Sequence, residues 1–337
     1  MKPIAELYKE LPAQKKIVIT MHQKPDPDAM GSALGLYHFL SSFGHTINVV
    51  SPTNWAAFLD WMPGCDTVMD YENCKQREKI EPLLKEADWI FCLDFNTISR
   101  TRNLANPVSA MSAVKIVIDH HQQPDTAFFD YGISDVAKSS TCEMVYDFIL
   151  NSGHADRINL DIAECLYAGV MGDTGSFRYS SATESLHLMV AALKAKGLRH
   201  TRVHDNIYDN FLENRLRFIG HVLMNRMNVY YEYNTALISI PKNDLLKYEI
   251  KTGDTEGLVN YPLSIRGIKL AAIVIDRDEE RKWSFRSKGD FDANTFARKY
   301  FEGGGHYSAS GGKSSESLDK TVQKFLEAMK ENALQLQ

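Results

Sequence analysis

Residues 16–32 read KIVITMHQKPDPDAMGS and join a strand pattern to a helix pattern through a short polar loop. The run KIVIT at 16–20 is continuous and rich in β-branched residues, which is typical of a parallel strand buried on both faces. Over 28–43, apolar residues recur at helical spacing, and the following Gly44 is a natural end for a helix. This stretch therefore predicts a buried strand, a loop and a helix in direct succession.

The same alternation of strand and helix patterns continues through the first half of the chain. Further strands are predicted at 47–50, 89–93, 115–118 and 128–131. Helices are predicted at 75–86, 99–106, 140–149 and 160–169. Strands that alternate with helices indicate an α/β domain with a mainly parallel sheet flanked by helices.

The second half of the chain has a different pattern. Helical spacing extends over 184–226, and strands are then predicted at 229–240, 268–275 and 282–286, with helices at 293–300 and 318–333. We therefore expect three parts in the chain. They are an N-terminal α/β domain over 1–190, a helical linker over 191–227 and a smaller C-terminal α/β domain over 228–337.

The bulk composition excludes several classes of protein. The chain has 337 residues and a formal net charge of −5, so it lacks the basic excess of proteins that coat long nucleic acids. Its five cysteines are odd in number and none forms a C-x-x-C pair, which indicates a reduced, cytoplasmic protein without a disulfide framework. Because the chain starts MKPIAELYKE and has no apolar run of about 20 residues, we expect neither a signal peptide nor a membrane partner.

Aspartate and histidine side chains gather where the predicted strands and one helix end. The candidate metal ligands are His22, Asp26, Asp28, Asp94, His120 and Asp173. In open α/β sheets, ligands bind at the carboxyl ends of the strands, which lie along one edge. Taken singly, each residue could instead be a helix cap, a turn residue or a surface histidine. Four segments that converge on one sheet edge favour a metal centre over those separate explanations.

The chemistry of this set points to a pair of divalent cations. Four carboxylates and two imidazoles without a thiolate suit Mn²⁺, Mg²⁺ or Co²⁺ better than a structural zinc ion. Six ligands exceed one tetrahedral site and suit two ions that share a carboxylate. Asp119 leads directly into His120 and His121, and such a carboxylate can orient a ligating imidazole.

The motifs resemble those of the DHH phosphoesterase superfamily. In that family's order they are HxxxDxD (22–28), the strand-end Asp94, DHH (119–121) and GDTG (172–175). FRS at 285–287 and GGGH at 303–306 resemble the family's C-terminal domain of the DHHA1 type. The length and arrangement are most similar to the bacterial oligoribonuclease (nanoRNase) and pAp phosphatase branch. The resemblance implies a DHH fold in the first domain and a mixed sheet in the second.

Carried over position by position, the resemblance divides the ligands between two metals. His22 and Asp26 would bind the first metal, Asp28 and His120 the second, and Asp94 would bridge both. Asp173 would bind the second metal and could also reach the first. Asp119 would orient a histidine, and His121 would face the scissile phosphate. The sequence leaves open whether His121 donates a hydrogen bond to that phosphate or a proton to the leaving group.

The C-terminal domain is expected to recognise the substrate. By resemblance, Arg286 and His306 would grip the substrate's far phosphate. Glycines allow backbone N–H groups to approach a phosphate, and arginine offers a planar fork that matches its oxygens. The substrate-binding candidates are Arg286, Ser287, Gly303, Gly304, Gly305 and His306, with Arg178 as a further candidate.

The implied reaction is hydrolysis of a phosphate ester by a hydroxide held between two metal ions, with Mn²⁺ as first choice and Mg²⁺ or Co²⁺ as alternatives. The implied substrates are short single-stranded oligonucleotides (nanoRNA), the 3′-phosphate of pAp, or both, with no long nucleic acid. One alternative is an enzyme of the same chemistry acting on linear or cyclic dinucleotides or on pyrophosphate. Another is a nucleotide sensor without catalysis, which the intact ligand set disfavours. Family analogy leaves a homodimer open.

Overall fold

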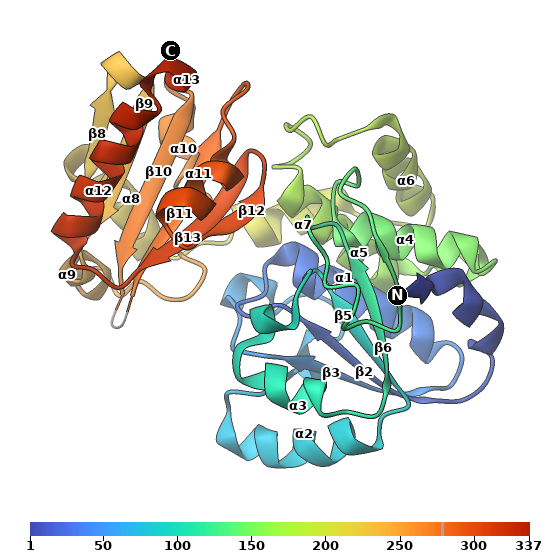
Figure 1. Cartoon of the computed structure of the whole chain (residues 1–337). Coiled ribbons are helices and arrows are strands. Elements are labelled where there is room, and N and C mark those ends of the chain that lie inside the picture. The colour runs from blue at the N-terminus through green and yellow to red at the C-terminus, as the bar shows by residue number, and fades with distance from the viewer. Residues whose placement is uncertain (278–279) are drawn as a thin grey trace. The chain divides into compact units, whose positions relative to one another are not determined.

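The computed structural model describes residues 1–277 and 280–337, and the chain divides into two compact units (Figure 1). Unit 1 is Met1–Asn210 and unit 2 is Phe211–Gln337. Each unit has its own sheet, with a hydrophobic core on each face of it. The division between the units falls inside the segment 191–227, whose assignment as a linker stays a prediction.

Unit 1, all of whose residues are described, is built on a seven-stranded sheet in which every pairing is parallel. The strand order is β1-β7-β6-β5-β2-β3-β4. The strands are β1 (Lys2–Pro3), β2 (Lys16–Met21), β3 (Thr46–Ser51), β4 (Met69–Asp70), β5 (Trp89–Leu93), β6 (Val114–Asp119) and β7 (Tyr131–Ser134). The predicted α/β class with a mainly parallel sheet is confirmed. The strand expected at 128–131 starts later, because Phe128 and Phe129 pack into the core instead.

Helices cover both faces of this sheet (Figure 1). Ile17 and Ile19 of β2 face one core and Val18 faces the other, as the alternation of a strand requires. The first core is covered by α1 (Pro27–Ser41), α4 (Thr141–Asn151), α5 (Leu160–Asp173), α6 (Glu184–Ala195) and α7 (His200–Tyr208). The second core is covered by α2 (Cys74–Glu86), the 3-10 helix η4 (Ile98–Leu104) and α3 (Ala105–Ser109).

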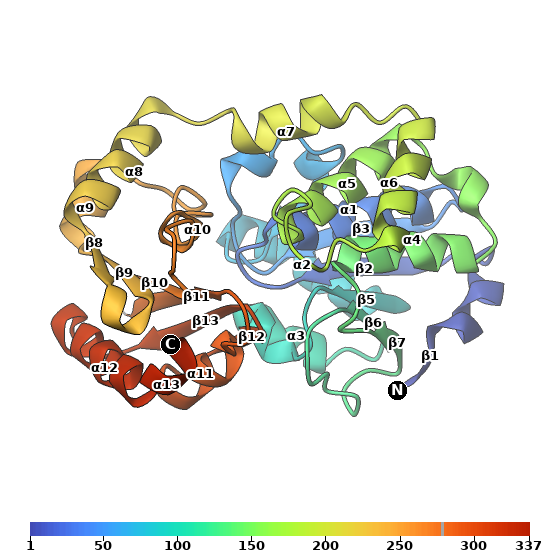
Figure 2. The same ribbon diagram turned by 90° about the horizontal axis from the view of Figure 1, so that it is seen from above.

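Helices α1 and α5 lie side by side with their backbones in close approach (Figure 2). A Cβ added at Gly31 of α1 would collide with the carbonyl oxygen of Cys165 in α5. A Cβ added at Gly169 of α5 would collide with the Cys142 sulfur and lie 2.8 Å from a carboxylate oxygen of Asp28. Glycine is needed at both positions because no side chain fits there. The contact brings the start of α1 next to the end of α5.

The long helical pattern over 184–226 is three helices, α6, α7 and α8 (Glu213–Asn225). Gly197 has a φ of 95°, which ends the first helix in a conformation that favours glycine. A second break follows α7 at Asp209. Within the part of the chain that the structure describes, none of the helices has both the length and the apolar character required to cross a membrane.

Unit 2 contains a mixed sheet, which confirms the expectation for the C-terminal domain. In its described residues the strand order is β12-β13-β11-β10-β9-β8, with β9 and β10 parallel and the other pairs antiparallel. The strands are β8 (Met227–Tyr230), β9 (Thr235–Ile240), β10 (Leu270–Asp276), β11 (Arg281–Ser287), β12 (Gly304–His306) and β13 (Ala309–Ser314). One face packs on α11 (Ala293–Tyr300) and α12 (Leu318–Glu331), and the other on α8, α9 (Lys242–Lys247) and α10 (Asn260–Leu263).

One local prediction in unit 2 is wrong. The single strand expected over 229–240 is the antiparallel pair β8 and β9, because Asn234 adopts a φ of 45° and reverses the chain. In the candidate binding segment 303–306, Gly304–His306 form the edge strand β12, which pairs with β13.

Candidate metal centre

The strand ends that carry candidate ligands are neighbours in the sheet. β2, β5 and β6 are adjacent, and Met21, Leu93 and Ile118 lie at the same level of the register. The next residues, His22 and Asp94, therefore leave the sheet together, and His120 follows one residue later. The strand order also reverses between β5 and β2, which is where open α/β sheets bind their ligands.

Helices supply the remaining candidates. Asp26 is the N-cap of α1, where its Oδ1 accepts hydrogen bonds from the N–H groups of Asp28 and Ala29 at 2.9 and 3.0 Å. Asp28 lies in the first turn of α1 and is fully buried. Asp173 is the last residue of α5, whereas the sequence placed it in a turn beyond a shorter helix. The close packing of α1 on α5 brings Asp28 and Asp173 to the same place.

These residues form two groups that share one carboxylate. In the first group, His22 Nε2 lies 3.7 Å from Asp26 Oδ2 and 3.3 Å from Asp94 Oδ2. In the second, His120 Nε2 lies 3.8 Å from Asp28 Oδ2, 3.2 Å from Asp173 Oδ2 and 3.5 Å from Asp94 Oδ1. Within each of the trios His22–Asp26–Asp94 and Asp28–His120–Asp173, one ligand atom per residue lies within 4.8 Å of the others. Asp94 presents one oxygen to each group.

Hydrogen bonds set the orientation of both ligand imidazoles. The Nδ1 atom of His22 lies 2.8 Å from the carbonyl oxygen of Gln23. The Nδ1 atom of His120 lies 3.3 Å from the carbonyl oxygen of Lys138. A neutral ring that donates from Nδ1 carries its lone pair on Nε2, the atom that faces the carboxylates in both residues. Both imidazoles are therefore turned to bind a cation through Nε2.

The charges of this buried cluster need compensation. Burial alone would lower the pKa of His22, but hydrogen bonds with Asp26 and Asp94 raise it from 6.5 to about 10. Burial and the neighbouring charge of Asp94 raise the pKa of Asp28 well above its usual range. Burial also opposes ionisation of Asp94, yet hydrogen bonds with the two imidazoles hold its pKa well below the ordinary value. Protons thus offset an excess of negative charge, and this buried, oxygen-rich donor set is suited to divalent cations.

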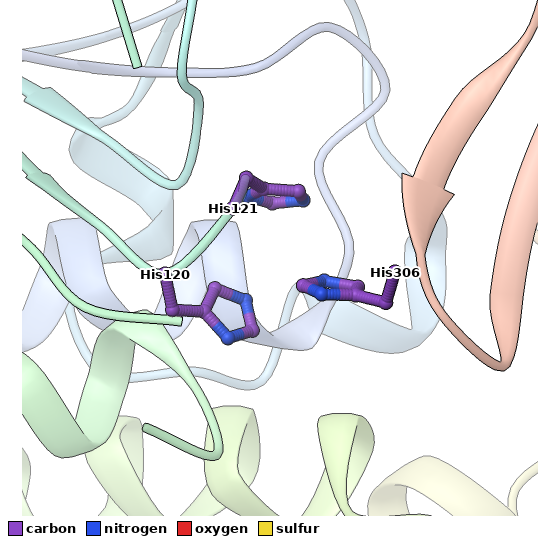
Figure 3. Close-up of side chains that lie close together, drawn as sticks. All are labelled: His120, His121 and His306. Carbon is purple, nitrogen blue, oxygen red and sulfur yellow. The ribbon is translucent and has the colours of Figure 1, made fainter. Parts of the chain in front are cut away.

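A second histidine stands beside the ligands. His120 and His121 project from the end of β6, with their rings edge to face at 4.9 Å between centroids (Figure 3). The Nδ1 atom of His121 lies 2.7 Å from Asp119 Oδ1 and 3.6 Å from Asp94 Oδ1. Asp119 is fully buried, so its carboxylate fixes the His121 ring in one orientation.

Apart from Arg178, the substrate-binding candidates lie in unit 2. Arg286 of β11 and His306 of β12 both pair with Ala309 of β13, which lies between them. Paired residues on neighbouring strands point to the same face, so Arg286 and His306 emerge on one face, two strand spacings or about 10 Å apart. Ser287 points to the opposite face, where its hydroxyl donates to the carbonyl oxygen of Phe291 at 2.7 Å.

Close packing and backbone conformation explain why glycine occupies positions 303 and 305. A Cβ at Gly303 would collide with the carbonyl oxygen of Gly311, and Gly305 has a φ of 147°. Gly304 stands beside the side chain of Arg298, and a Cβ added there would lie 3.6 Å from that guanidinium. In unit 1, the further candidate Arg178 donates from Nε to the carbonyl oxygen of Gly175 at 2.6 Å.

Sequence reasoning missed the residues that hold the ligands in place. Thr141 and Cys142 at the start of α4 donate their N–H groups to the two carboxylate oxygens of Asp28, at 2.7 and 2.9 Å. The stretch Ser140-Thr-Cys-Glu143 matches a helix capping box, a signal that could have drawn attention to this helix start. The pattern carries no information about Asp28, which lies more than a hundred residues earlier.

Comparison with known proteins identifies the family. Residues 16–170 match the family model described as the DHH family, N-terminal domain, and residues 234–334 match the DHHA1 domain. The chain belongs to the DHH family, as its motifs predict, and is a hydrolase of phosphate esters.

Individual relatives cover nearly the whole chain. The bifunctional oligoribonuclease and PAP phosphatase NrnA of Bacillus subtilis is 29% identical over 91% of this chain and 91% of its own length. The protein of the same name from Thermus thermophilus is 27% identical over 98% of this chain and 94% of its own. The crystal structure of an exopolyphosphatase-related protein from Bacteroides fragilis is 38% identical, with a TM-score of 0.92 over 98% of this chain and 97% of that one.

Proposed function

We propose that this protein is a two-metal phosphoesterase that hydrolyses short oligonucleotides and the 3′-phosphate of pAp. The observation that carries the proposal is the position of Asp94, whose two oxygens face two separate ligand groups. A carboxylate placed in this way would be able to bind two divalent ions at once, as a two-metal site needs.

The proposed ligands divide as the two groups do. His22, Asp26 and Asp94 would hold one ion, and Asp94, Asp28, His120 and Asp173 would hold the other. Mn²⁺ is our first choice for both positions, since carboxylate oxygens with some imidazole nitrogen suit it, and Mg²⁺ or Co²⁺ are the alternatives. Two ions held there supply Lewis-acid polarisation of the phosphate and activation of water at neutral pH.

His121 is the proposed catalytic side chain outside the ligand set. Asp119 accepts the hydrogen bond from Nδ1 of His121, which directs Nε2 of His121 away from Asp119. When both of its ring nitrogens carry a proton, His121 can donate from Nε2 either a hydrogen bond to a phosphate oxygen or a proton to the leaving group. Asp119 holds the ring in this orientation.

Recognition of the substrate is proposed to rest on Arg286 and the segment 303–306. Arg286 and His306 share one face of the sheet and could contact one phosphate group from two sides. The named relatives from Bacillus subtilis and Thermus thermophilus act on oligoribonucleotides and PAP, and we extend that substrate class to this chain.

The proposal is tested by hydrolysis assays on the purified protein with Mn²⁺, with EDTA as the control. The panel contains pAp, RNA of two to five nucleotides, long single-stranded DNA, cyclic dinucleotides and pyrophosphate. We expect metal-dependent release of phosphate from pAp and of mononucleotides from the short RNA. If no member of the panel is hydrolysed in a metal-dependent way, the proposal that this protein is a phosphoesterase is refuted. Preference for long DNA, cyclic dinucleotides or pyrophosphate would refute the substrate class.

Asp94→Ala tests the shared carboxylate separately. The variant should lose turnover and bind fewer than two Mn²⁺ ions per chain in a calorimetric titration, while its circular dichroism stays that of the parent. Arg286→Ala should instead raise KM for pAp and leave the metal stoichiometry at two. Retained turnover in Asp94→Ala would contradict the assignment of the bridge.

A further inference from the structure

The start of α4 contacts two metal-ligand candidates that come from different parts of the fold. Thr141 is fully buried, and its hydroxyl donates to Asp94 Oδ1 at 3.0 Å. Its N–H donates to Asp28 Oδ2 at 2.7 Å. One residue thus joins the carboxylate at the end of β5 to the carboxylate in the first turn of α1.

The backbone of Asp94 adopts an uncommon conformation that its surroundings must hold. Its φ is 62°, in the left-handed region that a non-glycine residue rarely adopts. The backbone is held on both sides, since its N–H donates to the carbonyl oxygen of Ile118 at 3.1 Å and its carbonyl accepts from Arg100 Nη1 at 3.3 Å. These bonds fix the Cα position but do not hold the carboxylate. The carboxylate is held by the imidazoles of His22 and His120, which would also bind the cations, and by the hydroxyl of Thr141, which lies outside the ligand set.

The hydroxyl also leaves the carboxylate able to bind cations. An ionised carboxylate has about four lone-pair directions, two on each oxygen. Thr141 occupies one direction on Oδ1 and leaves the other on Oδ1 and both on Oδ2 available. Oδ2 faces His22 and Oδ1 faces His120, so both oxygens still present a lone pair to a ligand group.

We propose that Thr141 is a positioning residue whose hydroxyl fixes the Asp94 carboxylate in the orientation that serves both metal ions. The inference rests on the proposed two-metal function. The backbone N–H that holds Asp28 survives any substitution except proline, so a change at position 141 isolates the bond to Asp94.

The test compares Thr141→Val with Thr141→Ser. Valine keeps the shape and removes the hydroxyl, whereas serine keeps the hydroxyl. We expect Thr141→Val to weaken Mn²⁺ binding in a calorimetric titration by roughly 10–100-fold, the usual effect of losing a group that orients a metal ligand. Thr141→Ser should bind close to the wild-type affinity. With saturating Mn²⁺, kcat for pAp should fall in Thr141→Val while KM changes little, and the spin coupling of the Mn²⁺ pair in electron paramagnetic resonance should change.

Thr321→Val is the matched control. Thr321 is a fully buried threonine of unit 2, and its hydroxyl accepts the Trp283 Nε1–H bond at 3.0 Å. This variant should lower the melting temperature and leave Mn²⁺ affinity unchanged. If Thr141→Val does not fold, Thr141→Ala provides the same comparison with a smaller side chain.

The outcomes separate this inference from the proposed function. If the wild-type chain does not bind two Mn²⁺ ions, the two-metal proposal is refuted, and so is the role of Thr141, which rests on it. If the wild type binds two ions and Thr141→Val binds them equally well with an unchanged kcat, only the role of Thr141 is refuted. An effect that Thr141→Ser shows as strongly as Thr141→Val would also refute it, since serine retains the hydroxyl.

Discussion

Glu143 is a buried carboxylate on which the loop before α4 depends, and its replacement by glutamine has a predictable cost. The side chain is 3% exposed. Oε2 accepts from the N–H and the hydroxyl of Ser139 at 2.9 and 2.7 Å, and Oε1 accepts from Lys138 Nζ and the Ser185 hydroxyl, both at 3.1 Å. The carbonyl of Lys138 is in turn the acceptor for Nδ1 of His120, so this carboxylate supports a metal-ligand candidate.

The cost of Glu143→Gln follows from which bonds survive. The amide oxygen can take over the two bonds from Ser139, and the hydroxyl of Ser185 can rotate to accept from the new amide. Lys138 loses its partner here but keeps Asp147 at 2.6 Å. One charge-assisted bond is lost and three become neutral, which we estimate at about 2–3 kcal/mol of unfolding free energy. For a domain of this size, that corresponds to a melting temperature lower by roughly 4–12 °C.

The assay is thermal and urea unfolding of wild type and Glu143→Gln between pH 3.5 and 7. Burial alone would raise the pKa of Glu143, but hydrogen bonds from Ser139 and Lys138 outweigh it and lower that pKa from 4.5. A lowered folded-state pKa gives stability that is present above the unfolded value and lost as pH falls through the folded one. The difference in unfolding free energy between the two proteins should therefore be constant from pH 7 to 5. It should narrow as the pH falls below 4.5 and on through the lowered folded-state pKa of Glu143, where the wild-type carboxyl becomes neutral like the glutamine amide.

The control is Glu86→Gln, which removes an exposed partner of Lys16 and should change the melting temperature little. Equal stability of wild type and Glu143→Gln at pH 7 would refute the reasoning. So would a difference that stays the same down to pH 3.5.

Three further predictions concern other parts of the chain. Asp94→Asn should abolish Mn²⁺-dependent hydrolysis and, unlike wild type, show no rise in melting temperature when Mn²⁺ is added. Gly31→Ala should lower the unfolding free energy, measured with urea, by about 1–3 kcal/mol because α1 and α5 must separate. Gly220→Ala is the control: a Cβ there meets nothing within 4 Å, so this variant should be more stable by about 0.4–1 kcal/mol. Asp244→Asn should lower the unfolding free energy at pH 7 by about 1.5–3 kcal/mol, because the hydrogen bond from Arg226 favours the ionised carboxylate and holds the pKa of Asp244 below its ordinary value. This loss should become smaller as the pH falls through that lowered pKa.

The strands and their ends could be predicted because their signal is local. KIVIT and WIFCL are apolar runs that only a buried strand explains in this context, and His22 and Asp94 follow them directly. The position of Asp173 was harder to predict from the sequence. Glycines on both sides suggested a turn, but Gly172 instead allows α5 to continue past Pro27 of α1 in close contact.

The support of the ligands could not be predicted, since it depends on contacts far apart in sequence. The hydrogen bond from Thr141 to Asp28 spans 113 residues, and the sequence of neither segment predicts contact with the other. The prediction of a single strand over 229–240 was wrong for a related reason. The strand-like alternation of the sequence continues through Tyr231 to Tyr233, and only the left-handed conformation at Asn234 shows that the chain turns back there.

The contact of α1 with α5 makes the site easier to widen than to tighten. Asp28 and Asp173 are carried by helices whose backbones approach closely at Gly31 and Gly169, so neither of these positions has a side chain that could be trimmed. A glycine-to-alanine change would push the two carboxylates apart and favour a larger ion such as Ca²⁺. Selection for a smaller ion has no such route in the packing and would have to exchange the ligands themselves.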